Sequence, residues 1–193
     1  MRAIVALGNP GPKYAVTRHN AGFLLADVLA EQWRLPKLRR WGHALVAEGR
    51  RRRQSLVLLK PQTYMNLSGD AVAQLLAARD LDPSTDLLVL VDDIALPLGT
   101  FRLRARGSAG GHNGLESVEA AVGSPEYARL RIGVGPLPED VDDQAEFVLS
   151  NFEPEEIATL ADLLPPLVDA VECWLLEGID AAMNRFNRRG TET

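Results

Sequence analysis

The order of apolar and polar positions along the chain predicts buried strands with helices between them. Three short runs, Ala3–Leu7, Leu56–Leu59 and Leu87–Val91, contain aliphatic side chains and no polar ones. Unbroken runs of this kind are typical of strands buried on both faces, as in a mostly parallel sheet that is covered by helices. The sequence therefore predicts such a sheet at the centre of the molecule.

Segments with helical periodicity lie between and after these runs. In Asn20–Trp33 the apolar residues recur at i, i+3, i+4, i+7 and i+8, and polar residues take the opposite face. Ser68–Asp80 repeats the pattern, with Ser68 as a candidate N-cap. Further helices are expected over Asn113–Val122 and over a C-terminal stretch at about 165–186. Strands that alternate with helices indicate the α/β class.

Two other segments alternate apolar and basic residues. In Phe101–Arg106 and Arg129–Val134 every second residue is apolar, and arginines hold most positions between them. Same-face residues of a strand lie about 6.6 Å apart, which is near the spacing of phosphates along an extended nucleic-acid strand. The pattern therefore fits phosphate binding, and it fits equally well a charged edge strand that deters aggregation.

Composition and length narrow the class of protein. With 193 residues, 46% hydrophobic and 24% charged, the chain resembles an ordinary globular protein of one domain. No apolar run approaches the roughly 18 residues that span a bilayer, and the first run is too short for a secretory signal, so we expect a cytoplasmic protein. A single cysteine, Cys173, excludes a disulfide framework and a Cys-based zinc site. The three histidines show no metal-ligand spacing, and no metal or other cofactor is expected.

The net charge of −5 hides an uneven distribution. Four consecutive arginines stand at Arg50–Arg53, whereas acidic residues gather at Glu139–Asp143 and Glu153–Glu156. An acidic chain can still present one basic face to a nucleic acid. The four arginines are themselves more typical of a solvated hairpin turn. Residues 135–143 form the most loop-like stretch, and we expect a mobile flap there that extends to about residue 150.

Polar residues stand where the predicted strands and loops end, which is where α/β sheets usually bind ligands. Asn9 follows the first apolar run, Asp92 follows the third, Asn66 precedes a predicted helix, and Asn113 closes a glycine-rich loop. His19 stands just before a helix, whose N-terminus disfavours the imidazolium, so this histidine tends to remain able to accept a proton. A carboxylate such as Asp92 can hold an imidazole in one tautomer and stabilise the cation that forms after proton transfer.

Each of these residues also has a structural interpretation. The asparagines could be turn formers or helix caps, and Asp92 could accept hydrogen bonds from a loop. The sequence contains neither a Gly-x-Ser-x-Gly elbow nor a Walker A motif. One histidine base, one acid, three amides and no nucleophilic side chain suit direct attack of an activated water on a carbonyl, with amides holding the substrate and the developing oxyanion.

Seven short blocks of the sequence form a recognisable set in a characteristic order. They are Gly8–Gly11, Tyr14–Gly22, Pro61–Gly69, Val91–Asp93, Gly107–Gly114, Arg129–Gly135 and Phe147–Leu149. Together they resemble the bacterial-type peptidyl-tRNA hydrolase family over most of the chain. The resemblance implies a single α/β domain over residues 1–193 with a mixed twisted sheet and flanking helices. It also implies hydrolysis of the ester that joins a peptide to tRNA, which recycles tRNA from peptidyl-tRNA lost prematurely by ribosomes.

The resemblance also implies a role for individual residues. His19 would be the general base that activates water, Asp92 would keep it basic and oriented, and Asn9 would distinguish N-blocked from free aminoacyl-tRNA. No metal, cofactor or covalent intermediate is implied. The expected partners are peptidyl-tRNA and, transiently, the ribosome, with no membrane contact and a monomeric state. The positions implied to contact the substrate are Tyr14, Tyr64, Met65, Asn66 and Asn113, and those implied to grip the tRNA are Arg104 and Arg131.

Two other classes of function compete with this interpretation. A non-enzymatic RNA-binding relative would be expected to have lost the water-activating pair or the amides, but the four key residues Asn9, His19, Asp92 and Asn113 are present. An α/β enzyme acting on a nucleoside or a small ester would carry the arginines only as edge charges. Failure to bind tRNA, or comparable hydrolysis of simple esters, would favour that second class.

Overall fold

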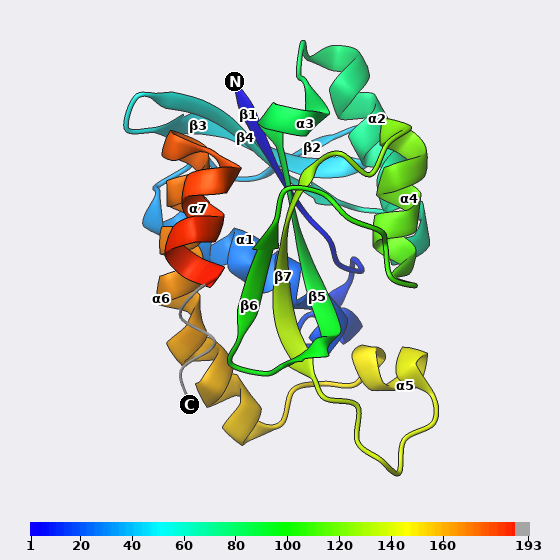
Figure 1. Ribbon diagram of the computed structural model, residues 1–193. Helices are drawn as coiled ribbons and strands as arrows, with labels where there is room; N and C mark the ends of the chain where they lie inside the picture. Colours follow the sequence, from blue (N-terminus) through cyan, green and yellow to red (C-terminus); the bar gives the residue numbers. More distant parts are fainter. Residues whose placement is uncertain (188–193) are drawn as a thin grey trace.

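The computed structural model describes residues 1–187 and is built around a seven-stranded sheet (Figure 1). The four central strands run parallel to one another, and the strands at both edges are antiparallel to their neighbours. The predicted α/β fold with a mixed, mostly parallel sheet is confirmed. The strand order is β2 (Arg39–Trp41), β3 (Ala44–Arg51), β4 (Gln54–Pro61), β1 (Arg2–Ala6), β5 (Leu87–Pro97), β7 (Ala128–Gly135) and β6 (Phe101–Arg104).

Helices cover both faces of the sheet and create two separate cores. Ile4 and Ala6 of β1 join the core under one set of helices, whereas Val5 and Leu7 point into the other core. This division explains why the apolar runs are unbroken, since both faces of each central strand are buried. The first set is α1 (Ala21–Gln32), α6 (Pro154–Glu177) and α7 (Ile179–Phe186), and the second is α2 (Ser68–Ala78) and α4 (Asn113–Val122).

The C-terminal helix differs from the prediction of one helix at about 165–186. The structure has two helices, because α6 ends at Glu177 and Gly178, with φ 94°, separates it from α7. Helix α6 also begins earlier, at Pro154, where Glu153 and Glu156 form a capping box. The proline pair at 165–166, where the predicted helix began, lies inside α6.

Two local predictions have opposite outcomes. Ser68 does not cap α2, because its hydroxyl donates instead to the carbonyl of Met65, 2.8 Å away in the 3-10 helix η3 (Met65–Leu67). Arg50–Arg53 do lie at the turn of the β3–β4 hairpin, as predicted. The side chains of the second and third of these arginines pair with Glu172 of α6.

The expected flap, residues 135–150, comprises the end of β7, a loop and the short helix α5 (Gln144–Leu149) (Figure 1). Asp143 caps this helix by accepting from the backbone N–H groups of Ala145 and Glu146. A second short helix, α3 (Pro83–Asp86), leads into β5. Among the helices of residues 1–187, none has the length and apolar character needed to cross a membrane.

Candidate active site

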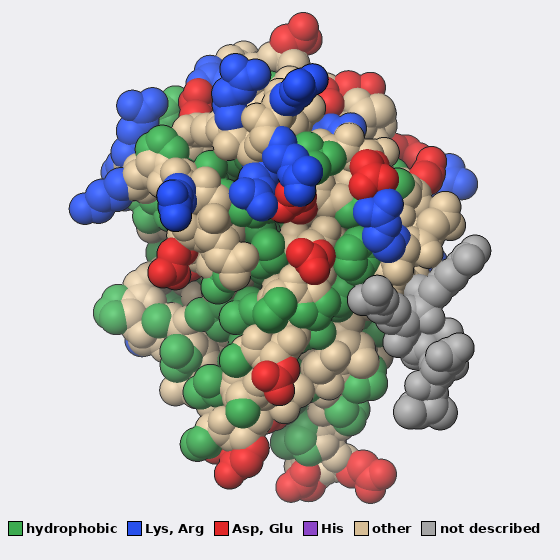
Figure 2. Space-filling view, turned by 90° about the vertical axis from the view of Figure 1, so that its left-hand side faces the viewer, with side chains coloured by type: hydrophobic (Ala, Val, Ile, Leu, Met, Phe, Trp, Pro, Cys, Tyr) green, Lys and Arg blue, Asp and Glu red, His purple; other side chains and the backbone are tan. Residues whose placement is uncertain are grey.

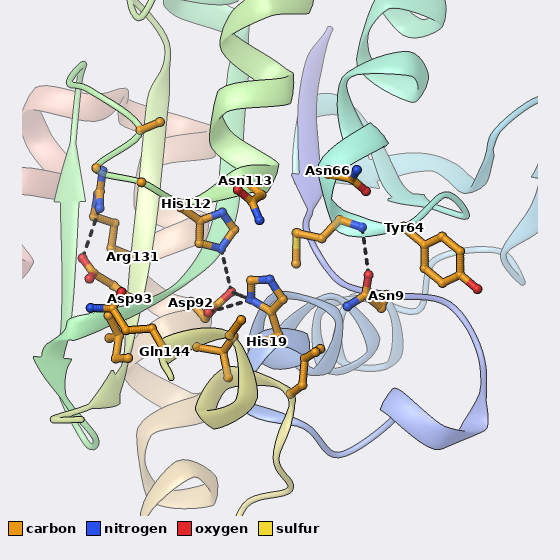
Figure 3. Close-up of a pocket in the computed structure, with 18 of the residues that line it drawn as sticks. Asn9, His19, Tyr64, Asn66, Asp92, Asp93, His112, Asn113, Arg131 and Gln144 are labelled. Carbon is orange, nitrogen blue, oxygen red and sulfur yellow. Dashed lines mark hydrogen bonds and ion pairs between the residues drawn. The ribbon is translucent and has the colours of Figure 1, made fainter. Parts of the chain in front are cut away.

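A pocket of about 540 Å³ lies at the carboxyl ends of the parallel strands (Figure 3). Its wall is formed by the loop after β1, the start of η3, the middle of β5, the glycine-rich loop before α4, and α5. The crossing of these segments at one sheet edge brings together residues that are far apart in the sequence. The residues singled out from the sequence that line the pocket are Asn9, Tyr14, His19, Tyr64, Met65, Asn66, Asp92, Asn113 and Arg131.

His19 and Asp92 form a buried pair at the centre of the pocket. His19 lies in the 3-10 helix η2 (Arg18–Asn20) directly before α1, and its Nδ1 is 2.9 Å from each carboxylate oxygen of Asp92. Asp92 was expected to end its strand, but β5 continues to Pro97. A carboxylate only accepts hydrogen bonds, so Nδ1 carries the proton and Nε2 is the basic nitrogen.

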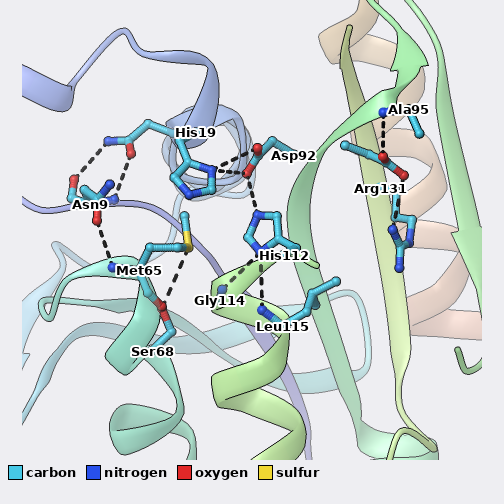
Figure 4. Close-up of polar contacts among 12 residues, drawn as sticks. Asn9, His19, Met65, Ser68, Asp92, Ala95, His112, Gly114, Leu115 and Arg131 are labelled. Atoms are coloured by element: carbon cyan, nitrogen blue, oxygen red, sulfur yellow. Dashed lines mark hydrogen bonds and ion pairs between the residues drawn. The ribbon is translucent and has the colours of Figure 1, made fainter. Parts of the chain in front are cut away.

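A second imidazole, to which the sequence analysis gave no role, completes this group. His112 Nε2 is 3.0 Å from Asp92 Oδ1, and its ring centroid is 4.9 Å from that of His19. The Nδ1 atom of His112 accepts from the backbone N–H groups of Gly114 and Leu115, at 3.1 and 3.3 Å, and so caps α4 (Figure 4). Because those two amides can only donate, the ring proton is on Nε2 and is donated to Asp92.

The signal for His112 was present in the sequence. The residue stands at the N-cap position of the predicted helix Asn113–Val122 and immediately follows two glycines. The spacing between the histidines along the sequence does not reveal this contact, because the residues involved are brought together by different strands. The fold places His112 and His19 on either side of the same carboxylate.

The environment of Asp92 favours its ionised form. Burial by itself raises the pKa of this carboxyl group, but electrostatic attraction and hydrogen bonds from His112 and His19 outweigh the effect and hold the pKa well below its ordinary value. Asp92 is therefore an anion, placed to orient His19 and to stabilise a positive charge on its ring.

The same three residues also bring three potential metal-ligating atoms within 4.8 Å of one another. The hydrogen bonds of His112 disfavour this use. A metal ion on Nε2 of His112 would require the ring proton on Nδ1, where it would face the N–H groups of Gly114 and Leu115. The arrangement is better suited to orienting the His19 ring than to coordinating a metal.

Asn9 presents a fixed amide beside the histidine. Its side-chain oxygen accepts from the backbone N–H of Met65 at 2.8 Å, and its own backbone exchanges two hydrogen bonds with the side chain of Asn20. The oxygen is thus occupied, and the NH₂ group is turned into the pocket towards His19 (Figure 3). This group can donate to a carbonyl oxygen or to an oxyanion.

The rest of the pocket combines an exposed aromatic rim with an apolar wall. Tyr64 is 62% exposed at the rim, whereas Met65 is buried in the wall. Val148 and Leu149 of α5 add further apolar surface. The sequence periodicity gave no sign of α5, and the resemblance at Phe147–Leu149 was the only indication that this segment belongs to the site.

The arginines of the two alternating segments are used in different ways. Arg131 lines the pocket, bonded to Asp93 at 3.2 Å and to the carbonyl of Ser108 at 2.8 Å. Arg104 is exposed on the edge strand β6, outside the pocket. Arg129 was considered for phosphate binding, and this was wrong. Its side chain is fully buried and donates to the carbonyls of Gly107 and Pro125.

Comparison with known proteins identifies the family to which the chain belongs. The family model for peptidyl-tRNA hydrolase matches residues 3–193. The chain is 50% identical to a peptidyl-tRNA hydrolase of Chloroflexus aggregans, covering 97% of this chain and 99% of the relative, and 45% identical to that of Gemmatimonas aurantiaca, covering 97% and 100%. The crystal structure of peptidyl-tRNA hydrolase from Acinetobacter baumannii superimposes with a TM-score of 0.90 at 32% identity, over 97% of this chain and 94% of that one. The chain belongs to the peptidyl-tRNA hydrolase family.

Proposed function

We propose that this protein hydrolyses the ester bond between peptide and tRNA in peptidyl-tRNA released prematurely from ribosomes, and thereby recycles the tRNA. Membership of the family supports this activity. The observation that carries the chemistry is the buried His19–Asp92 pair, which leaves one basic nitrogen beside the fixed amide of Asn9 in the same pocket.

In the proposed reaction His19 acts as a general base. Its Nε2 removes a proton from water while the water oxygen bonds to the ester carbonyl carbon. The C–O bond to the ribose then breaks, and the imidazolium returns the proton to the departing ribose oxygen. General-base catalysis of this kind is worth roughly 10²–10⁴-fold in rate. The Asp92 anion stabilises the imidazolium, and the direct attack needs no covalent intermediate.

Amide groups supply the electrostatic part of the mechanism. The NH₂ group of Asn9 is placed to donate to the carbonyl oxygen as negative charge develops there. Asn113 lies at the start of α4 and Asn66 lies in η3, and both line the pocket. We assign these two amides to the substrate backbone and the oxyanion, and the apolar side chain of Met65, which also lines the pocket, to the peptide.

The layout of the site gives the substrate a direction. Figure 3 shows Arg131 on one side of His19, and Asn9 with Tyr64 on the other. The phosphates of the tRNA would lie on the Arg131 side, with Arg104 further along the outside of the sheet. The peptide then leaves on the Asn9 side, where Tyr14 and Tyr64 offer aromatic surfaces.

The remaining assignments follow from this substrate. Helix α5 lines the pocket and is joined to β7 by a loop, which supports residues 135–150 as a mobile cover. In this proposal the protein acts as a monomer. A substrate shed by ribosomes implies a cytoplasmic location and transient ribosome contact.

The activity is tested with two substrates that differ only at the amino group. N-acetyl-aminoacyl-tRNA is expected to be cleaved in the presence of EDTA, and the same tRNA carrying a free aminoacyl group is expected to be spared. Salt-sensitive tRNA binding without cleavage would indicate an RNA-binding relative instead. Absence of both cleavage and tRNA binding would overturn the assignment.

A further inference from the structure

A second, smaller pocket adjoins the active site and has no part in the mechanism above. Its volume is about 260 Å³, and it shares Asn9 with the larger pocket. The same two loops supply residues to both pockets. Tyr14 lines the first and Ala15 the second, while Tyr64 lines the first and Gln62 the second. The second pocket is therefore a continuation of the active site beyond Asn9.

One part of the wall of this pocket is apolar. Phe23 and Leu24 contribute from α1, and Leu45 contributes from β3. Leu45 is paired with Lys60 of β4 across the antiparallel ladder, so the two side chains lie on the same face of the sheet. An apolar wall of this kind favours an apolar side chain over a charged or strongly hydrated group.

An ion pair between the nearly buried Lys60 and the exposed Asp27 adds polar groups to this wall. The Nζ of Lys60 is 2.5 Å from Asp27 Oδ1 and 4.7 Å from the Phe23 ring, and the Lys60 side chain is only 11% exposed. An ammonium group carries three donors, and Asp27 accepts from one of them. The others are available to a carbonyl oxygen. A phosphate is disfavoured there, because Asp27 neutralises the lysine and would repel a second anion.

We propose that the second pocket binds the peptide residue that precedes the ester-linked one, with its backbone carbonyl near Lys60 and its side chain against Leu24 and Leu45. This inference rests on the hydrolase function proposed above. The ester has two sides, and Arg131 lies on the side that would take the tRNA. The acyl side extends past Asn9, which is the residue common to both pockets.

The test compares two substrates that share one tRNA and one ester-linked residue. These are N-acetyl-phenylalanyl-tRNA and N-acetyl-leucyl-phenylalanyl-tRNA. The unaltered protein is expected to have a kcat/KM roughly tenfold higher for the longer substrate, which is the lower end of what an apolar group contributes in a pocket. Leu45→Trp fills the pocket and is expected to bring this ratio close to one.

A matched variant controls for the bulk of the new side chain. Leu76 is also a half-buried leucine, but it lies on α2 on the opposite face of the sheet, so Leu76→Trp should keep the tenfold ratio. If Leu45→Trp fails to fold, Leu24→Trp fills the same pocket from its other wall and is expected to bring the ratio close to one.

Three results would overturn the inference. A kcat/KM ratio near one between the two substrates in the unaltered protein would show that the pocket does not bind the additional peptide residue. Weaker binding of uncharged tRNA by the Leu45→Trp variant would show that the pocket holds RNA. Failure of the unaltered protein to cleave even N-acetyl-phenylalanyl-tRNA would overturn the hydrolase function together with the subsite.

Discussion

At the residue scale, the orientation of His19, the proposed general base, depends on hydrogen bonds that begin at a helix end. The first amides of α4 fix the tautomer of His112, which donates to Asp92. Asp92 in turn holds Nδ1 of His19 and leaves Nε2 free to act on the substrate. A helix cap and a catalytic pair are thus joined through one carboxylate.

Two substitutions of His112 distinguish its hydrogen bond to Asp92 from its role as the cap of α4. Asparagine is a good N-cap but is too short to reach Asp92, whereas alanine loses both contacts. We expect kcat/KM to fall by about 10–100-fold in His112→Asn and in His112→Ala, the range for a hydrogen bond to a charged group. Only the alanine variant should lose about 1 kcal/mol of stability from the missing cap, measured by urea unfolding. Full activity in His112→Asn would show that its bond to Asp92 is dispensable.

The depressed pKa of Asp92 sets a pH window for stability. The pKa of Asp92 in the folded protein lies below the ordinary value of 3.8, so above that pH the ionised carboxylate makes its full contribution to the free energy of unfolding. This contribution is lost as the pH falls through the pKa of the folded state. The difference in unfolding free energy between the wild type and Asp92→Asn should therefore narrow as the pH falls below about 4. A difference that does not narrow at all below about pH 4 would contradict the ionised state of Asp92.

The sequence predicted some of these residues and missed others for a physical reason. Asn9 and Asp92 could be identified because a buried strand leads directly into each of them. His112 could not be paired with Asp92, since their contact depends on the distance between β5 and the start of α4. Arg129 followed the same alternation as Arg131, but the loop and helix that enclose it are not visible in the strand pattern.

At the element scale, the position of α1 brings His19 to Asp92. A Cβ atom on Gly22 would lie 2.6 Å from the carbonyl oxygen of Leu90 and 2.7 Å from that of Leu7. The start of the helix therefore packs directly on the backbones of β1 and β5. Only glycine permits this approach, and the turn that carries His19 immediately precedes it.

Gly22→Ala should move the start of α1 away from the sheet. We expect it to cost about 1–3 kcal/mol, as overpacking usually does, and to lower kcat because His19 moves relative to Asp92. Ala158→Gly, at an exposed position of α6, should cost about 1 kcal/mol through helix propensity alone and leave kcat unchanged. Unfolding curves and rates for both variants separate the two effects. Normal kcat in Gly22→Ala would contradict the role given to this contact.

Helices and strands with a clear pattern of apolar and polar positions could be predicted from the sequence, and those without such a pattern could not. The central strands and α4 could be read from apolar runs and periodicity. Helix α5 has only six residues, which is less than two helical turns, so no periodicity could be detected. The short edge strand β2 consists of Arg-Arg-Trp and is mostly exposed, so it has no apolar signal.

At the scale of the whole molecule, charge is segregated although the net charge is −5. On the face in Figure 2, Lys and Arg side chains lie in the upper half, while the lower end carries Asp and Glu among apolar groups. The acidic loop before α5 and the start of α6 lie at the lower end of Figure 1. A nucleic acid that contacts the upper half of this face, where Lys and Arg outnumber the acidic groups, meets a local field that differs in sign from the overall charge.

Binding of tRNA should weaken as salt is raised, because each neutralised phosphate releases counterions. We expect Arg104→Gln to reduce the slope of log K against log salt concentration by about 1. Arg53→Gln, in the exposed hairpin turn, removes the same charge from a position outside the site and should leave the slope unchanged. Equal effects of the two substitutions would indicate that only net charge matters.

The central claim, that His19 activates water for ester hydrolysis, is tested most directly by measuring single-turnover cleavage of N-acetyl-aminoacyl-tRNA by His19→Ala with and without added imidazole. We expect the rate to fall by about 10²–10⁴-fold. Added imidazole should restore part of it, in proportion to the neutral form of the base. A rate within a few-fold of the unaltered protein would contradict the assignment of His19 as the general base.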